Sequence, residues 1–229
     1  MNRYRKSGAV PAIGLLALLL GIAQPVSAAD APQPVTAIDI LLDPDATMVK
    51  HAEAANARLR KEFPKGFVLD ATHHPHISYA AVGKVLATEK PATWKLKAYK
   101  YYYIPWKEIG LAGVVIEPTD DLIRYQKKLI DAVAPFTVKT GTATAFVTTK
   151  EDPDINEPTI EYVAAFVPHA TGQKFNPHVT IGIATQDYLK KMLDEKFEAF
   201  TFSLAGASVY HLGNFGTARK ELKSWTFKP

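Results

Sequence analysis

Cysteine is absent from the 229-residue sequence. A chain without thiols forms no disulfides, has no thiol nucleophile and binds no metal through thiolates, so these three kinds of chemistry are excluded. Two further signatures are also missing. The sequence has no G-x-x-x-x-G-K-[S/T] loop, which cradles nucleotide phosphates, and no H-E-x-x-H pair, which holds a catalytic zinc ion.

Long apolar runs are scarce, and the N-terminal one is shorter than a membrane span. Three basic residues among the first six precede an apolar run over 9–23, and the small residues Val26-Ser27-Ala28 follow. This is the layout of a secretory signal peptide, and the run falls short of the roughly 20 residues that a spanning helix needs. We predict a signal peptide over residues 1–28 and a periplasmic or secreted mature protein, with an N-terminal membrane anchor as the alternative. No later segment is apolar over a sufficient length, so we expect no membrane association after cleavage.

Excess charge of one sign is small in the mature chain. The full sequence carries a formal charge of +4, but residues 1–28 hold three basic residues and no acidic ones, which leaves +1. A nearly neutral domain does not indicate an extended nucleic-acid-binding surface. Residues 29–229 are enough for one domain with its own core, and we expect a monomer.

The hydrophobic pattern predicts alternating strands and helices. Apolar residues at helical spacing predict a helix over 46–62 with Asp45 as its N-cap. Further helices are expected from 119 to about 133 and over 159–166 and 186–195. Strands are expected over 35–42, 94–106 (strand or hairpin), 111–116, 142–149, 197–212 and 217–227 and at the two segments described next. Hairpin-like connections dominate this order, which predicts an α+β fold with mainly antiparallel sheets, in two lobes around a central cleft.

Two segments about a hundred residues apart share one pattern. They read His76-Ile77-Ser78-Tyr79 and His178-Val179-Thr180-Ile181. Side chains alternate between the two faces of a strand, so each segment places an imidazole and a hydroxyl on one face and two apolar anchors on the other. One such segment is a weak signal, because His169-Ala170-Thr171 also matches; it is expected in a loop without alternating anchors, and we discount it. The pair is stronger than either copy.

These paired H-x-[S/T]-x segments resemble the 2H phosphoesterase superfamily, which includes 2′-5′ RNA ligase-like proteins and cyclic phosphodiesterases. The first segment departs from the usual pattern in having Ser78 and the aromatic Tyr79. The resemblance implies a bilobal α+β fold and a metal-independent phosphodiesterase without cofactors. It also implies that His76 and His178 are catalytic and that Ser78 and Thr180 bind phosphate.

The residue chemistry agrees with this reading. Histidine titrates near neutral pH, so two imidazoles in one cleft can act as base and acid, while the hydroxyls orient the phosphate and stabilise developing charge. We expect the substrate to be a small nucleotide or oligonucleotide with a 2′,3′-cyclic phosphate, or a related 2′-5′ phosphodiester. Two alternatives stay open: a non-catalytic nucleotide- or phosphate-binding protein of the same fold, and a metal-dependent hydrolase that uses the cluster His73–His76.

Two other features bear on the cleft. The aromatic residues around Tyr101, Tyr102, Tyr103 and Trp106 are a candidate stacking surface for a nucleobase. Because alternate residues point to opposite faces, at most part of this run lines one cleft, and we expect most of it to pack in the core. Lys174 lies just before the second segment, within reach of a phosphate, although a solvated loop lysine is the simpler interpretation.

Overall fold

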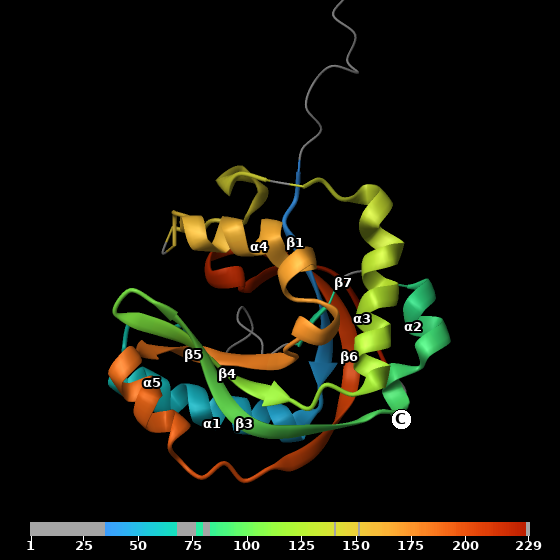
Figure 1. Ribbon diagram of the computed structural model, residues 1–229. Coiled ribbons are helices and arrows are strands. Elements are labelled where there is room, and N and C mark those ends of the chain that lie inside the picture. Colours follow the sequence, from blue (N-terminus) through green and yellow to red (C-terminus); the bar gives the residue numbers. More distant parts are fainter. Residues whose placement is uncertain (1–34, 68–76, 80–82, 140, 151, 228–229) are drawn as a thin grey trace, which may run out of the picture. The chain divides into compact units, whose positions relative to one another are not determined.

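Seven strands form one antiparallel sheet in the computed structural model (Figure 1), which describes residues 35–67, 77–79, 83–139, 141–150 and 152–227. The strands are β1 (Ile38–Pro44), β2 (Ile77–Tyr79), β3 (Lys95–Trp106), β4 (Ile109–Ile116), β5 (His178–Thr185), β6 (Phe200–Leu212) and β7 (Ala218–Thr226). Their order is β2-β1-β6-β3-β4-β5, and β7 also pairs with β6. Every pairing is antiparallel. The predicted fold class is thus confirmed.

Strand β6 joins the two halves of the sheet. Its first residues, Phe200–Ser203, pair with β3, whereas from Leu204 onward it pairs with β1 and then also with β7. Each half ends in one of the two strands that carry the paired motifs, β2 in one half and β5 in the other. Although these strands stand at opposite ends of the order, Cα atoms of β2 and β5 come within 8 Å of each other. The curvature of the sheet therefore brings the two motif strands together.

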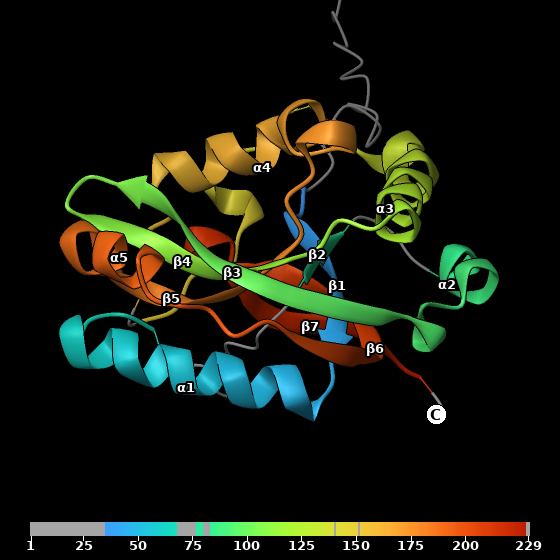
Figure 2. The ribbon, with the colours of Figure 1, turned by 60° about the horizontal axis from the view of Figure 1, so that its bottom comes forward.

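Five α-helices within the described ranges pack around the sheet. They are α1 (Ala46–Glu62), α2 (Lys84–Glu89), α3 (Asp120–Val133), α4 (Glu157–His169) and α5 (Gln186–Leu193). The Asp45 carboxylate accepts hydrogen bonds from the amides of Thr47 and Met48 at 3.0 and 3.3 Å, which confirms the predicted N-cap of α1. Figure 2 shows α1 and α4 on opposite faces of the half formed by β3, β4 and β5. In the main core, Leu59 of α1 and Ile181 of β5 are fully buried, together with residues of α3 and α5.

The structure corrects one predicted strand and decides between two alternatives for another segment. The strand predicted over 142–149 is wrong: Ala143–Ala145 form a 3₁₀ turn, and this segment makes single backbone hydrogen bonds to Ala37 and Leu212 instead of a ladder. Its threonine- and valine-rich composition favours strands, but its two hydrogen bonds lie just beyond the last pair of the β1–β6 ladder, Ile38 with His211. The segment 94–106 is one strand, β3, and not a hairpin.

The helix predicted over 159–166 is longer than expected and includes Pro168 in its last turn. Proline lacks an N–H group and removes one helical hydrogen bond. The following residues close the helix, because the amide of Ala170 donates to the carbonyl of Phe166 and the Thr171 hydroxyl donates to that of Val167, both at 2.8 Å. His169 is therefore the last residue of α4, not a loop residue as predicted.

The chain divides after Gln33 into two units, and all described residues belong to the second, Pro34–Pro229. The predicted signal peptide, residues 1–28, lies outside the described residues. Among the helices that the structure does describe, none combines the length and the apolar character needed to cross a bilayer.

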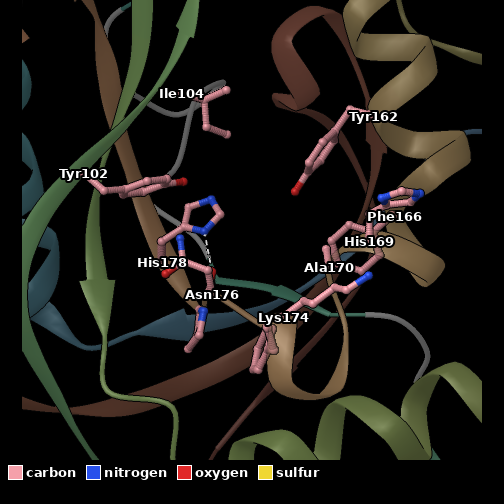
Figure 3. A pocket seen from close by; sticks show the side chains of 11 residues that line it. Tyr102, Ile104, Tyr162, Phe166, His169, Ala170, Lys174, Asn176 and His178 are labelled. Atoms are coloured by element: carbon pink, nitrogen blue, oxygen red, sulfur yellow. Dashed lines mark hydrogen bonds between the residues drawn. The ribbon is translucent and has the colours of Figure 1, made fainter.

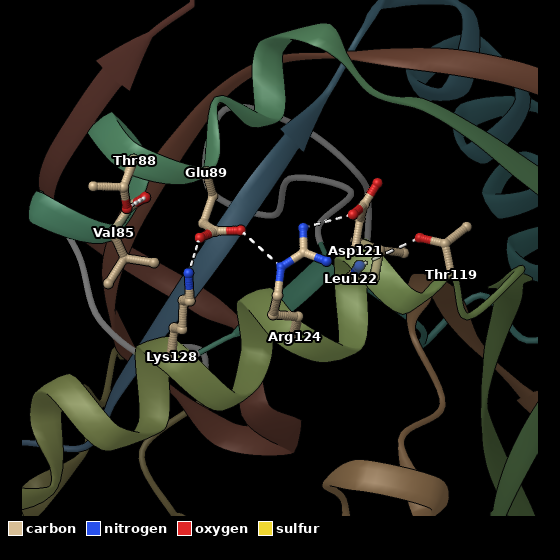
Figure 4. A network of polar contacts seen from close by, with 8 residues as sticks. All are labelled: Val85, Thr88, Glu89, Thr119, Asp121, Leu122, Arg124 and Lys128. Carbon is tan, nitrogen blue, oxygen red and sulfur yellow. Dashed lines mark hydrogen bonds and ion pairs between the residues drawn. The ribbon is translucent and has the colours of Figure 1, made fainter.

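A charge cluster joins α2 to α3 (Figure 4). The Glu89 side chain is 6% exposed and pairs with Lys128 and with Arg124, whose Nε atom lies 3.2 Å from its carboxylate. The hydrogen bond from Lys128 is the main cause that holds the pKa of Glu89 below its ordinary value of 4.5, and Arg124 acts in the same direction. A carboxyl group whose pKa is lowered by folding stabilises the protein above its unfolded pKa, and this contribution disappears as pH falls through its folded pKa.

We expect Glu89→Gln to lower the melting temperature at pH 7. The difference from wild type should shrink as pH falls from about 4.5 through the lowered pKa of the folded protein, where the wild-type carboxyl group also becomes neutral. Thermal unfolding followed by circular dichroism from pH 7 to pH 3 measures this. Glu117→Gln is the matched control, because the Lys97–Glu117 pair is about half exposed on both sides and exposed pairs contribute little. Equal effects of the two substitutions at pH 7 would contradict the assignment.

Candidate active site

The second motif begins β5 and has the predicted two faces. Val179 and Ile181 are fully buried in the main core, in one cluster with Leu59 of α1. His178, one residue earlier, is only partly buried and lines a pocket. The apolar anchors thus hold the strand while the imidazole is turned away from the core.

The pocket has a volume of about 210 Å³ and lies between β3, the start of β5 and α4 (Figure 3). Its described lining residues are Tyr102, Ile104, Tyr162, Phe166, His169, Ala170, Lys174, Phe175, Asn176, Pro177 and His178. Tyr102 and His178 stand on one side, and Tyr162 on α4 points toward them from the other. Three segments that are far apart in the sequence therefore supply the walls.

The His178 ring is oriented by its own backbone. Its Nδ1 atom lies 2.7 Å from the carbonyl oxygen of Asn176. A carbonyl only accepts hydrogen bonds, so Nδ1 carries a proton and, in the neutral ring, Nε2 is the acceptor nitrogen. The Tyr102 ring contacts the imidazole edge-on, with centroids 4.8 Å apart. Together these contacts restrain the ring in position and tautomer, as a general acid or base requires.

Glycine at position 113 makes room for Tyr102. A Cβ atom there would lie 2.2 Å from Cε1 of the Tyr102 ring, so the ring lies across the bare backbone of β4. Gly113 pairs with Tyr102 on one side and with Thr180 on the other. Thr180 is 9% exposed and is not among the described residues that line the pocket. It therefore lies in the same cross-strand row as Tyr102, next to the pocket rather than in its wall.

Both phenols of the pocket are hydrogen-bond donors at neutral pH. Burial, with a smaller contribution from Tyr162, raises the pKa of Tyr102 well above its ordinary value. Although 45% of Tyr162 is exposed, the protein atoms around its hydroxyl partly desolvate it and, with a smaller contribution from Asp39, raise the pKa of Tyr162 to about 12. Protonated phenols donate hydrogen bonds to anionic oxygens without adding negative charge to the site.

The ionisable groups of the described lining favour anions. Lys174, His169 and His178 line the pocket, and none of its described lining residues is acidic. The Lys174 ammonium also donates to the Pro168 carbonyl at 3.3 Å, at the end of α4. Within the described ranges no group of three or more potential metal ligands occurs. The cluster His73–His76 lies outside them, so the metal-site alternative stays a hypothesis.

The first motif is described only in part. Its strand β2 pairs with β1, with Ser78 opposite Leu41. His76 and the side chain of Ser78 lie outside the described residues, so their roles stay predictions. The proximity of β2 to β5 is what the two-histidine hypothesis requires of the backbone.

Several pocket residues were missed or only partly anticipated in the sequence. The aromatic run divides as expected, since Tyr101 and Tyr103 pack against the main core while Tyr102 lines the pocket. Tyr162 had no recognisable signal, because its position depends on how α4 lies over the sheet. His169 was discounted as a chance match, yet it lines the same pocket as His178.

Two solved structures of Escherichia coli LigT are similar to the chain. The complex with 3′-AMP has 12% sequence identity and a TM-score of 0.33, covering 85% of this chain and 99% of that one. The complex with phosphate has 13% identity and a TM-score of 0.31, covering 85% and 98%. No protein-family description and no curated protein matches the sequence. Since likeness of this degree decides neither family nor activity, we base the function on this chain's own residues.

Proposed function

We propose that the protein is a metal-independent phosphodiesterase of the 2H type that hydrolyses a nucleoside or oligonucleotide 2′,3′-cyclic phosphate. The observation that carries this proposal is the placement of His178. Its Nδ1 atom bonds to the Asn176 carbonyl, and its ring lies in a pocket whose described ionisable groups are basic or phenolic. An oriented imidazole beside anion-binding groups suits proton transfer on a phosphate ester.

The reaction needs two imidazoles in opposite protonation states. One neutral imidazole takes a proton from water as the water oxygen bonds to phosphorus. The bond from phosphorus to one ribose oxygen breaks, and the second, protonated imidazole gives its proton to that oxygen. The product is a phosphomonoester. His178 supplies one imidazole and His76 the other, while Ser78 and Thr180 bind the non-bridging oxygens.

The pocket wall supports a nucleotide as the substrate class. Tyr162 and Phe166 lie one turn apart on α4, with ring centroids 5.9 Å apart, and 45% of Tyr162 is exposed. Exposed aromatic rings are a surface on which a base can stack, and Lys174 adds a cation that favours the phosphate.

We further propose that the protein acts as a monomer outside the cytoplasm, after cleavage near Ala28.

One assay separates the proposed activity from its rivals. Protein beginning at Ala29 is given a 2′,3′-cyclic nucleotide in EDTA, and the phosphomonoester product is followed by chromatography. We expect turnover that EDTA does not reduce. Turnover that EDTA abolishes and Zn²⁺ restores would instead assign the chemistry to a metal site. Tight nucleotide binding without turnover on a panel of cyclic and 2′-5′ substrates would identify a binding protein.

Replacing the buried hydroxyl should have a smaller effect than replacing a histidine. Valine fills nearly the same volume as threonine but has no hydroxyl group. We expect Thr180→Val to lower kcat/KM about tenfold, which corresponds to one hydrogen bond to a charged oxygen. Steady-state kinetics in EDTA measures this. A loss as large as that of a histidine variant would show that Thr180 does more than bind phosphate oxygen.

A further inference from the structure

Strand β5 contains a bulge directly after the second motif. Thr180 pairs with Gly113 and Gly182 pairs with Ala112. These two partners are consecutive in β4, so Ile181 is an extra residue inserted between two paired positions of β5. Before the bulge, the odd-numbered residues Val179 and Ile181 are buried in the main core; after it, the even-numbered Ala184 is buried there. The bulge therefore reverses the alternation of faces along the strand.

This reversal determines where His178 points. A regular strand that kept Ala184 in the core would also turn His178 and Thr180 toward the core, because residues of equal parity share a face. Instead His178 lines the pocket. The catalytic face of the motif thus depends on the extra residue at Ile181.

Asn56 of α1 holds this bulge. It is 4% exposed, and its Nδ2 atom donates to the Ile181 carbonyl at 2.8 Å. Gly182 has a φ of +145°, which favours glycine, and a Cβ atom there would lie 2.8 Å from Asn56 Nδ2. The Asn56 amide thus packs directly against the backbone of Gly182, where a side chain would not fit. Without Asn56, the Ile181 carbonyl would lose a buried hydrogen-bond donor.

The same amide nitrogen also reaches the chain that leads into the first motif. Asn56 Nδ2 donates to the Phe67 carbonyl at 3.0 Å, and Phe67 precedes the first motif in the sequence. One NH₂ group has two hydrogens, which matches one bond to each segment. Asn56 thus connects the segment before the first motif to the bulge behind the second.

We infer that Asn56 is a positioning residue for the active site: it fixes the bulge at Ile181–Gly182 and so presents His178 to the pocket. This inference rests on the proposed function for its kinetic consequence. It concerns a residue that is not among the described residues lining the pocket and that does not contact the substrate in the proposed reaction.

The test compares Asn56→Asp with Met48→Ala. Aspartate has the same shape, but its ionised carboxylate has no hydrogen to donate to the two carbonyl oxygens. Met48 is fully buried on the same helix, so Met48→Ala destabilises the core elsewhere. Both variants are assayed below their unfolding transitions. We expect Asn56→Asp to lower kcat roughly 100-fold with a smaller change in KM, as for misplacement of a reacting group, and Met48→Ala to change kcat little.

The His178 ring resonances provide a readout that needs no substrate. We expect Asn56→Asp to shift the imidazole signals in ¹H–¹⁵N spectra, and Met48→Ala to leave them in place. Wild-type kcat together with unshifted signals in Asn56→Asp would overturn the inference. If the aspartate variant does not fold, Asn56→Ala replaces it under the same criteria. If the wild type turns over no cyclic phosphate, the proposed function fails, and the ring signals alone decide the role of Asn56.

Discussion

Loss of about a thousandfold in turnover of a 2′,3′-cyclic nucleotide is expected for His178→Ala, within the roughly 10²–10⁴-fold range of a positioned acid or base. The imidazole is held by the Asn176 carbonyl and by the Tyr102 ring, so alanine removes a group whose proton-transfer atom is already oriented. Turnover in EDTA, measured by product chromatography, checks this. Nucleotide binding should weaken far less, because the cationic and aromatic lining remains.

His169→Ala is the matched control for this experiment. His169 lines the same pocket and belongs to a similar sequence pattern, but it ends α4 instead of lying on a strand with apolar anchors. We expect its replacement to change turnover by less than about tenfold. A loss for His169→Ala comparable with that for His178→Ala would require a different pair of catalytic histidines.

Replacement of His76 should be about as damaging as replacement of His178. If one imidazole is the acid and the other the base, removing either disables the same concerted proton transfers, again a loss of roughly 10²–10⁴-fold. Residues that act as a unit are not additive. We therefore expect the double variant to be hardly slower than the worse single variant, and steady-state or single-turnover rates of the three variants measure this.

Two results would contradict the two-histidine mechanism at this point. Full activity of His76→Ala would remove the first motif from the chemistry. Losses that multiply in the double variant would indicate that the two histidines act in separate steps. The chelator control remains essential, because His73 and His74 closely precede His76 in the sequence. A metal site formed by these residues would also lose activity when His76 is replaced.

Much of the fold follows from local pattern. The boundaries of α1 were predictable because Asp45 caps it and apolar residues recur at helical spacing until Pro64. The strand predicted over 142–149 failed because threonine and valine favour strands only where a partner edge is present. The extent of α4 was missed because a proline in the last helical turn costs one hydrogen bond, which neighbouring groups offset here.

The site was only half predictable. Val179 and Ile181 indicate a strand whose apolar face is buried in a core, so the outward direction of His178 could be inferred from period-two alternation. The same alternation predicts the wrong face for the residues after Ile181, such as Ala184. The bulge at Ile181 depends on pairing with β4 and on Asn56 from another element. Tyr162 could not be assigned from its neighbours, because an exposed tyrosine on a helix has no periodic signature.

The sequence by itself determined the strand of the second motif and its apolar anchors, because these depend on neighbours two residues away. It also led to the proposed class of chemistry, acid–base catalysis, because the chain pairs histidine with hydroxyl residues and has no cysteine. Only the tertiary structure decided that β2 and β5 approach each other, that Tyr102 and Tyr162 face one pocket, and that Asn56 secures the bulge. Those relations join segments far apart in the chain, and their geometry depends on sheet curvature and register, which no local pattern encodes.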